Sequence, residues 1–171
     1  MKHICSNLKN GEDYALFGYS MGALATYELI KLINMERKLH PPKWVFLAAH
    51  KPPCELGGDS IAMDDDKFID YLVSEGGISG AISNDELFKE IFLPIIRNDY
   101  KIIGAYNYSP FVFSETSIPV TILYGKNDDN GNILMWDKCL NRRCMYKAFP
   151  GGHFFINNCL ASICEVINYV L

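Results

Sequence analysis

The sequence has 171 residues, of which 49% are hydrophobic and 21% charged, and its formal net charge is -4. A chain of this length is typical of one domain with one hydrophobic core, and the composition excludes a disordered polar chain. The sixteen basic residues are scattered, so the sequence favours neither a nucleic-acid surface nor a surface for anionic membranes.

The N-terminal segment, residues 1–11, has no apolar run of signal-peptide length, and no stretch of the chain approaches eighteen apolar residues. We therefore expect a cytoplasmic protein, and we take it to be a monomer. The six cysteines form no C-x-x-C pair and have no histidine at zinc spacing. We expect reduced, mostly buried thiols, no metal site and no cofactor.

The first part of the chain alternates between strand and helix patterns. Residues 14–17 are a short apolar run that ends at a glycine, which is typical of a buried strand. Residues 21–33 are apolar on most sides and free of proline, which predicts a largely buried helix. Residues 44–49 predict a second buried strand, which the pair Pro52-Pro53 stops.

Residues from about 54 to 110 have a different character. Acidic or amide residues at 64–66 and 84–85 each precede a periodic apolar segment, and Gly76-Gly77 separates the two segments. Acidic residues favour helix starts because the first N–H groups are unpaired and the helix dipole is positive there. We therefore predict a helical insertion that carries no strand.

The last third of the chain returns to the alternation. Residues 120–124 predict a buried strand that ends in a glycine, and residues 145–149 predict a weaker strand. Strands that alternate with helices predict an α/β fold, with a mostly parallel sheet flanked by helices. Spacings of three and four predict one apolar face on a terminal helix, formed by Leu160, Ile163, Cys164, Ile167, Val170 and Leu171.

Residues 18–22 form the pentapeptide Gly-Tyr-Ser-Met-Gly, a G-x-S-x-G motif. The motif alone is weak evidence, since it arises by chance in about one chain in twenty of this length. Here it follows a predicted strand and opens a predicted helix, which is the placement of a nucleophile elbow with Ser20 as the nucleophile. We expect side chains at Gly18 and Gly22 to crowd the neighbouring strand and helix. The alternative is a glycine-rich turn with an ordinary N-cap serine.

A serine hydroxyl is a poor nucleophile without a base, and His153 is the best candidate. It lies after the last predicted strand and before the last helix, where an open parallel sheet presents residues at its carboxyl edge. Asp128 and Asp129 follow the strand before it, so the order of serine, acid and histidine is that of α/β hydrolases. Chemistry alone leaves the choice between the two aspartates open. His50 also follows a strand, but it precedes any candidate acid.

Several segments carry a more specific pattern. They are residues 17–23 (FGYSMGA), 27–29 (YEL), 68–77 (FIDYLVSEGG), 93–100 (LPIIRNDY), 106–108 (YNY) and 149–155 (FPGGHFF). Together they resemble the type II thioesterases, the stand-alone editing enzymes of nonribosomal peptide and polyketide synthesis, which have the α/β-hydrolase fold. In that family the acid lies three residues past the glycine that ends its strand, so the resemblance points to Asp128. The family usually has histidine where this chain has Tyr19.

The resemblance implies an activity and roles for particular residues. The substrate would be an acyl or aminoacyl thioester on the phosphopantetheine arm of a carrier protein, which would be the partner. Ser20, Asp128 and His153 would form a catalytic triad, and the backbone N–H of Met21 would be one oxyanion donor. The insertion at about 54–110 would be a lid whose apolar side chains bound the acyl pocket.

The family also has strands ahead of the elbow, and nothing before Ser20 resembles them. We therefore expect residues 1–171 to form a single, N-terminally incomplete α/β-hydrolase domain with only one of its two oxyanion donors. One alternative is another serine esterase with the same fold. A second is a catalytically impaired fragment that only binds carrier protein. An acyltransferase is disfavoured because it does not need the late acid.

Overall fold

The centre of the structure, a computed structural model that describes residues 12–36, 40–56, 63–111 and 118–170, is a parallel sheet. All three strand pairings are parallel, and the strand order is the chain order, β1-β2-β3-β4. The predicted α/β fold with a mostly parallel sheet is therefore confirmed. The strands are β1 (Ala15–Tyr19), β2 (Trp44–Ala48), β3 (Val120–Gly125) and β4 (Met145–Phe149).

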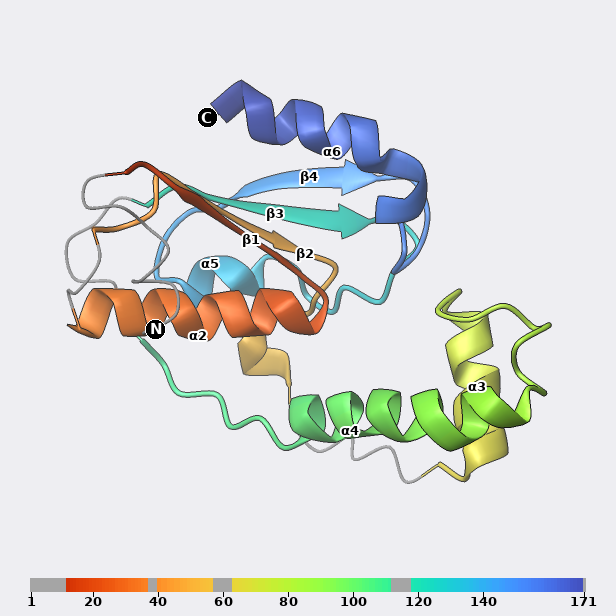
Figure 1. Cartoon of the computed structure of the whole chain (residues 1–171). Coiled ribbons are helices and arrows are strands. Elements are labelled where there is room, and N and C mark those ends of the chain that lie inside the picture. Colours follow the sequence, from red (N-terminus) through yellow and green to blue (C-terminus); the bar gives the residue numbers. More distant parts are fainter. Residues whose placement is uncertain (1–11, 37–39, 57–62, 112–117, 171) are drawn as a thin grey trace.

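Helices cover both faces of the sheet (Figure 1). Helix α2 (Met21–Glu36) and the short helix α5 (Met135–Cys139) lie on one face, and helix α6 (Ile156–Val170) lies on the other. Side chains of β2 alternate between the two cores, because successive residues of a strand point to opposite faces. Val45 and Leu47 pack in the core under α2, whereas Phe46 and Ala48 pack in the core under α6.

The C-terminal helix faces the sheet with a slightly different stripe from the predicted one. Leu160 is 58% exposed and Cys164 is exposed, so these two members of the predicted apolar face do not pack in the core. Because helical residues advance by about 100°, the two lie on the flank of the face centred on Ile163. Leu171 lies outside the described residues. The core-facing stripe consists of Cys159, Ile163, Val166, Ile167 and Val170.

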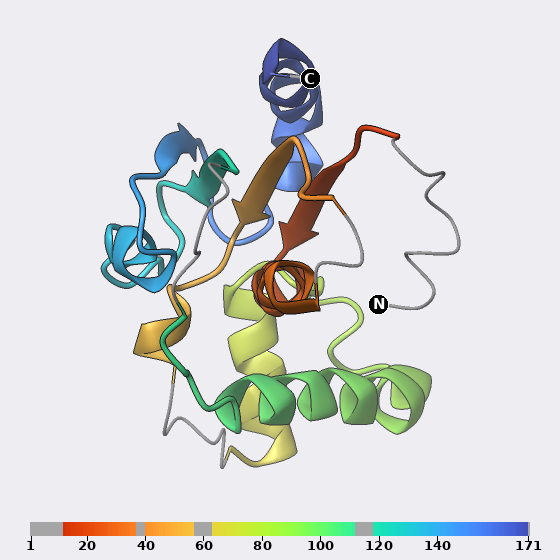
Figure 2. The ribbon, with the colours of Figure 1, turned by 90° about the vertical axis from the view of Figure 1, so that its left-hand side faces the viewer.

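The segment between β2 and β3 begins with a short 3-10 helix, η1 (Pro53–Glu55), and continues as helix α3 (Asp65–Ser74), π-helical turn η2 (Phe88–Phe92) and helix α4 (Leu93–Gly104). No strand occurs in residues 54–56 and 63–110, the described part of the predicted insertion, which agrees with the prediction. It lies beyond the carboxyl ends of the strands in Figure 1 and below α2 in Figure 2.

Acidic residues start both helical stretches of this segment, as predicted. An oxygen of Asp64 accepts a hydrogen bond from the backbone N–H of Lys67 at 2.9 Å, and an oxygen of Asp85 accepts one from Phe88 at 3.0 Å. Arg97 of α4 forms a 2.6 Å ion pair with Asp65 at the start of α3, which ties the two helices together. They enclose a small core of their own, formed by Phe68, Ile69, Leu72, Phe88 and Leu93.

None of the helices in the described residues combines the length and the apolar character that crossing a membrane requires. The five described cysteines are free thiols, and three of them, Cys139, Cys144 and Cys159, are buried.

The link from β1 to α2 is a sharp turn at Ser20, whose φ is 54°. Its backbone N–H donates to the carbonyl of Ala48 on the neighbouring strand at 2.9 Å. A Cβ added at Gly18 would lie 2.2 Å from the carbonyl oxygen of Gly22 and 2.4 Å from the hydroxyl of Thr26. A Cβ added at Gly22 would meet no atom within 4 Å, so the prediction of crowding was right for Gly18 and wrong for Gly22.

The two glycines therefore form a matched pair of variants. Gly18→Ala should lower the free energy of unfolding by roughly 1–3 kcal/mol, because backbone atoms of α2 must move. Gly22→Ala should leave it unchanged or raise it by up to about 1 kcal/mol, because alanine is the better helix former. Urea unfolding of both variants measures the difference, and equal losses of stability would contradict the packing described for this turn.

Candidate active site

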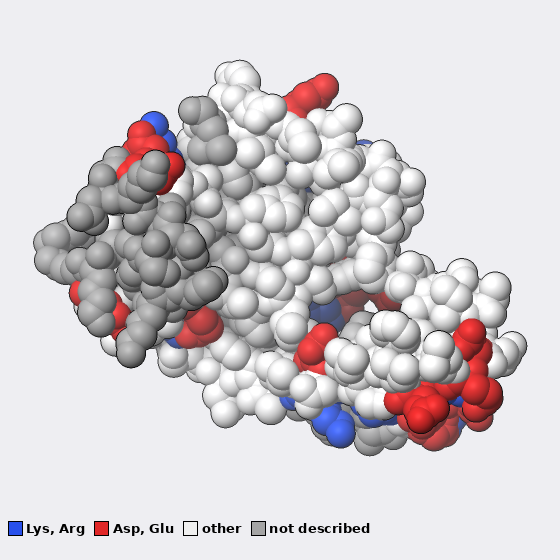
Figure 3. All heavy atoms as spheres, in the orientation of Figure 1, with Lys and Arg blue, Asp and Glu red and all other residues white. Residues whose placement is uncertain are grey.

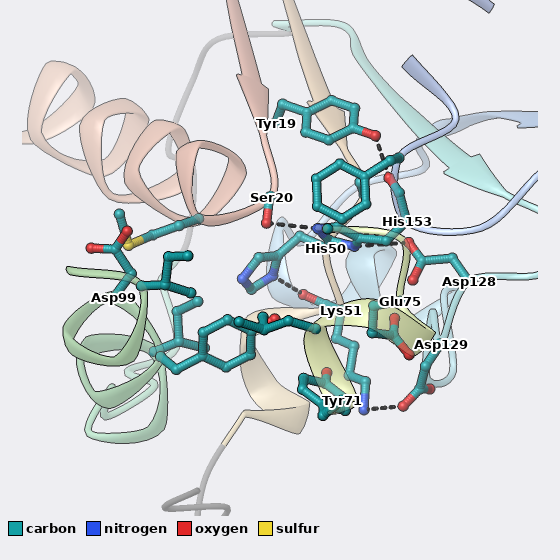
Figure 4. A pocket seen from close by; sticks show the side chains of 18 of the residues that line it. Tyr19, Ser20, His50, Lys51, Tyr71, Glu75, Asp99, Asp128, Asp129 and His153 are labelled. Atoms are coloured by element: carbon teal, nitrogen blue, oxygen red, sulfur yellow. Dashed lines mark hydrogen bonds and ion pairs between the residues drawn. The ribbon is translucent and has the colours of Figure 1, made fainter. Parts of the chain in front are cut away.

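Three side chains at the carboxyl edge of the sheet form a hydrogen-bonded chain (Figure 4). Ser20 follows β1, Asp128 follows β3 and His153 follows β4. The Nε2 atom of His153 lies 2.9 Å from the Oγ of Ser20, and its Nδ1 lies 3.3 Å from an oxygen of Asp128. The Asp128 side chain is only 5% exposed and that of His153 22%. The arrangement provides a hydroxyl, a base within reach of its proton, and a carboxylate that orients the base.

The loops that carry Asp128 and His153 are tied to each other. Backbone N–H groups of Lys126 and Asn127 donate to the carbonyls of Phe149 and Gly151 at 2.9 and 3.0 Å. The side-chain amide of Asn130 donates to the backbone carbonyl of Asp128 at 3.0 Å and to that of Gly125 at 2.8 Å. Because the bonds from Lys126 and Asn127 join the two loops directly, they limit how far the acid and the base can move relative to each other.

Asp129 lies in a different environment from Asp128. It forms a 2.6 Å ion pair with Lys51 from the loop after β2, and its side chain is 73% exposed. The hydrogen bond from Lys51 holds the pKa of Asp129 below its ordinary value. The contact with His153 belongs to Asp128.

The phenol of Tyr19 supports the histidine loop. Its hydroxyl donates a hydrogen bond to the backbone carbonyl of His153, and its ring packs edge-on to the imidazole. Burial raises the pKa of Tyr19 to about 12, so the phenol remains a donor at neutral pH. Sequence reasoning treated this residue only as a departure from the family pattern, because nothing in the sequence indicates a contact across 134 positions.

His50 also lines the site, although its position before any candidate acid made it a poor candidate for the base. Its Nδ1 lies 2.7 Å from the backbone carbonyl of Lys51, so Nδ1 carries the proton and Nε2 has a free lone pair. Burial lowers the pKa of His50, which keeps the ring neutral near pH 7. The indole of Trp136 donates to the His50 carbonyl at 3.2 Å, which fixes the backbone of this loop.

The N–H of Met21 stands at the start of α2 next to Ser20. First-turn N–H groups have no acceptor within their helix, and the helix dipole is positive there. The N–H of Ser20 itself is occupied by the carbonyl of Ala48. Met21 is therefore the amide beside the serine that is able to meet a developing oxyanion.

A cavity of about 450 Å³ opens beside Ser20, between the sheet edge and helices α3 and α4. Residues of both parts line it. From the sheet edge come Tyr19, Ser20, Met21, His50, Lys51, Asp128 and His153, and from the helical segment come Tyr71, Leu72, Glu75, Ile78, Ile96, Asp99, Tyr100 and Ile103. Within the described part of the chain, no group of three or more histidine, cysteine, aspartate or glutamate residues could hold a metal ion.

A family comparison matches almost the whole chain. The model of the thioesterase domain family matches residues 2–171. GrsT, the gramicidin S biosynthesis protein of Aneurinibacillus migulanus, is 32% identical over 84% of this chain and 57% of its own length. AngT, a probable anguibactin biosynthesis thioesterase of Vibrio anguillarum, is 30% identical over 85% of this chain and 59% of its own length. The chain thus spans a little over half the length of these relatives.

Solved structures show the same fold. ClbQ from the colibactin NRPS/PKS pathway superposes with a TM-score of 0.83 at 24% identity, over 99% of this chain and 72% of ClbQ. RedJ, a thioesterase from the prodiginine biosynthetic pathway of Streptomyces coelicolor, gives a TM-score of 0.82 at 22% identity, over 99% of this chain and 69% of RedJ.

The lowered pKa of His50 predicts a pH dependence of stability. Below its ordinary pKa of 6.5, the unfolded chain takes up a proton at His50 that the folded chain resists, so the free energy of unfolding falls as the pH decreases. In His50→Gln this contribution is absent, and the fall below pH 6.5 should be shallower. Urea unfolding of both proteins between pH 5 and 8 measures this contribution, and identical pH slopes would contradict a neutral, partly buried His50.

Proposed function

The chain belongs to the thioesterase domain family, and from this premise we propose that it hydrolyses acyl or aminoacyl thioesters carried on the phosphopantetheine arm of carrier proteins. The observation that carries the proposal is the hydrogen-bonded chain from Ser20 through His153 to Asp128 at the mouth of the cavity. The names of the relatives support the substrate class, since GrsT and AngT are named for gramicidin S and anguibactin biosynthesis and ClbQ for an NRPS/PKS pathway.

In the proposed first step, the Oγ of Ser20 attacks the thioester carbonyl while the Nε2 of His153 takes the hydroxyl proton. The carbonyl oxygen becomes negative and receives a hydrogen bond from the N–H of Met21. Asp128 keeps the proton on Nδ1 and stabilises the imidazolium. The C–S bond then breaks, and His153 returns the proton to the departing pantetheine sulfur.

In the second step, a water molecule replaces the thiol. His153 takes a proton from this water as it attacks the acyl-serine carbonyl, and then gives the proton to the Oγ of Ser20 as the acid leaves. The same histidine serves both steps because its Nε2 lies 2.9 Å from the serine oxygen that first loses and finally regains the proton.

The helical segment at about 54–110 acts, in this proposal, as the lid of a single hydrolase domain. Leu72, Ile78, Ile96 and Ile103 give it an apolar surface toward the cavity, where they would pack against the acyl chain. A carrier protein would dock so that its arm reaches Ser20 from the side between the lid and the sheet.

A serine-reactive fluorophosphonate probe tests the nucleophile. The folded wild-type chain should be labelled at Ser20, and Ser20→Ala should not be labelled, because the probe requires a serine oxygen that a neighbouring base activates. Intact-protein mass spectrometry measures the adduct. A folded wild-type chain that resists the probe would favour the alternative of a fragment that only binds carrier protein.

The two neighbouring aspartates provide a matched test of the acid. Asp128→Asn should lower kcat by a factor on the order of 10⁴, because the imidazole loses the carboxylate that fixes its tautomer. Asp129→Asn removes only the exposed ion pair with Lys51, and it should change kcat by less than about tenfold. Steady-state hydrolysis of an acyl-pantetheine thioester measures both, and comparable losses in the two variants would contradict the assignment of Asp128.

A further inference from the structure

The cavity beside Ser20 has an excess of negative charge. Five carboxylate residues and a single lysine line it. Lys51 is paired with Asp129 at 2.6 Å, Asp128 lies against His153, and an oxygen of Glu55 accepts the backbone N–H of Asn132 at 2.8 Å. The one lining cation is therefore already matched by a carboxylate. The five acidic residues are Glu55, Glu75, Asp99, Asp128 and Asp129.

Glu75 and Asp99 stand out among these residues. Each is half-buried, and within the described part of the chain neither side chain has a hydrogen-bond or ion-pair partner. Asp99 comes from α4, and Glu75 ends α3, so they approach the cavity from different sides (Figure 4). A carboxylate that loses part of its water without gaining a partner raises the free energy of the site, and a bound cation would offset this.

His50 supplies an independent indication of a donor in the same cavity. Its Nδ1 donates its proton in a hydrogen bond to the Lys51 carbonyl, so its Nε2 acts only as an acceptor. In Figure 4 the free edge of the ring is turned away from Lys51, toward the side of the cavity on which Asp99 lies. A saturated hydrocarbon acyl group placed there would cover this lone pair without a hydrogen bond, whereas an ammonium group would donate to it.

We propose that the cavity selects acyl groups that carry a cationic amine, the class to which aminoacyl thioesters belong. His50 accepts a hydrogen bond from the ammonium group, and Asp99 and Glu75 provide the negative field that favours its charge. The isoleucines of the lid hold the rest of the acyl chain. Figure 3 shows acidic residues next to basic atoms at the opening between the sheet and the lid. Because the carboxylates that line the cavity outnumber its single lysine, the net field favours the entry of cationic substrates. This inference rests on the proposed thioesterase activity and narrows its substrate class.

The test compares two pantetheine thioesters of nearly the same shape, alanyl and isobutyryl, in which an ammonium group replaces a methyl group. The ratio of their kcat/KM values is measured for the full wild-type chain and for variants. Because every protein receives the same two substrates, their different intrinsic reactivities cancel when ratios are compared. The alanyl-to-isobutyryl ratio should fall roughly tenfold in Asp99→Asn and in His50→Phe.

Asp70→Asn is the matched control, since Asp70 is an exposed carboxylate of α3 that does not line the cavity, and its ratio should equal that of the wild type. Asp99→Asn keeps the test decisive if His50→Phe fails to fold, because a half-exposed side chain is replaced by one of the same shape. An unchanged ratio in Asp99→Asn, with Ser20 still labelled by a fluorophosphonate, would overturn the amine selectivity alone. Absence of both labelling and hydrolysis would overturn the proposed function together with it.

Discussion

The turn at Ser20 is the constraint on which the rest of the site depends. An L-residue at a φ of 54° costs roughly 1–2 kcal/mol relative to ordinary helical or extended backbone, so the surrounding structure must stabilise the turn. The bond from the Ser20 N–H to Ala48 anchors it to the central sheet, and the missing side chain at Gly18 lets α2 approach. As a result of this turn, the serine oxygen projects from the sheet edge toward His153, and the first amide of α2 lies beside it.

The parallel sheet brings the other members of the site to the same place. Loops after β3 and β4 leave the sheet at the edge where β1 ends, so Asp128, His153 and Ser20 meet although 133 positions separate the serine from the histidine. Backbone bonds between the two loops limit their freedom, and Tyr19 adds a bond from the serine side to the histidine loop. Geometry of this kind favours catalysis because the reacting groups need little reorganisation when a substrate binds.

Much of the fold could be predicted because buried strands appear in the sequence as apolar runs. The strands at 44–48, 120–125 and 145–149 lie where apolar runs predicted them, and Asp64 and Asp85 start the helices that their acidic character indicated. The residues of α6 that pack against the sheet differ in part from the predicted apolar face, because spacing alone does not say which of two adjacent apolar rows meets the sheet. Contacts between distant segments leave no local pattern in the sequence. The structure was therefore needed to show the hydrogen bond from Tyr19 to the histidine loop, the tautomer of His50 and the open space at Gly22. The order of serine, acid and base was readable from the sequence; their catalytic roles stay a prediction.

The most direct measurement of the central claim is the capture of an acyl group on Ser20 during turnover. A pivaloyl thioester of pantetheine suits this purpose, since its hindered carbonyl slows the attack of water on the acyl-enzyme. After rapid acid quenching, intact-protein mass spectrometry should find one pivaloyl group per chain, and peptide mapping should place it on Ser20. Release of the pantetheine thiol with Ser20 unmodified, or with the acyl group on another residue such as Cys54, would contradict the account.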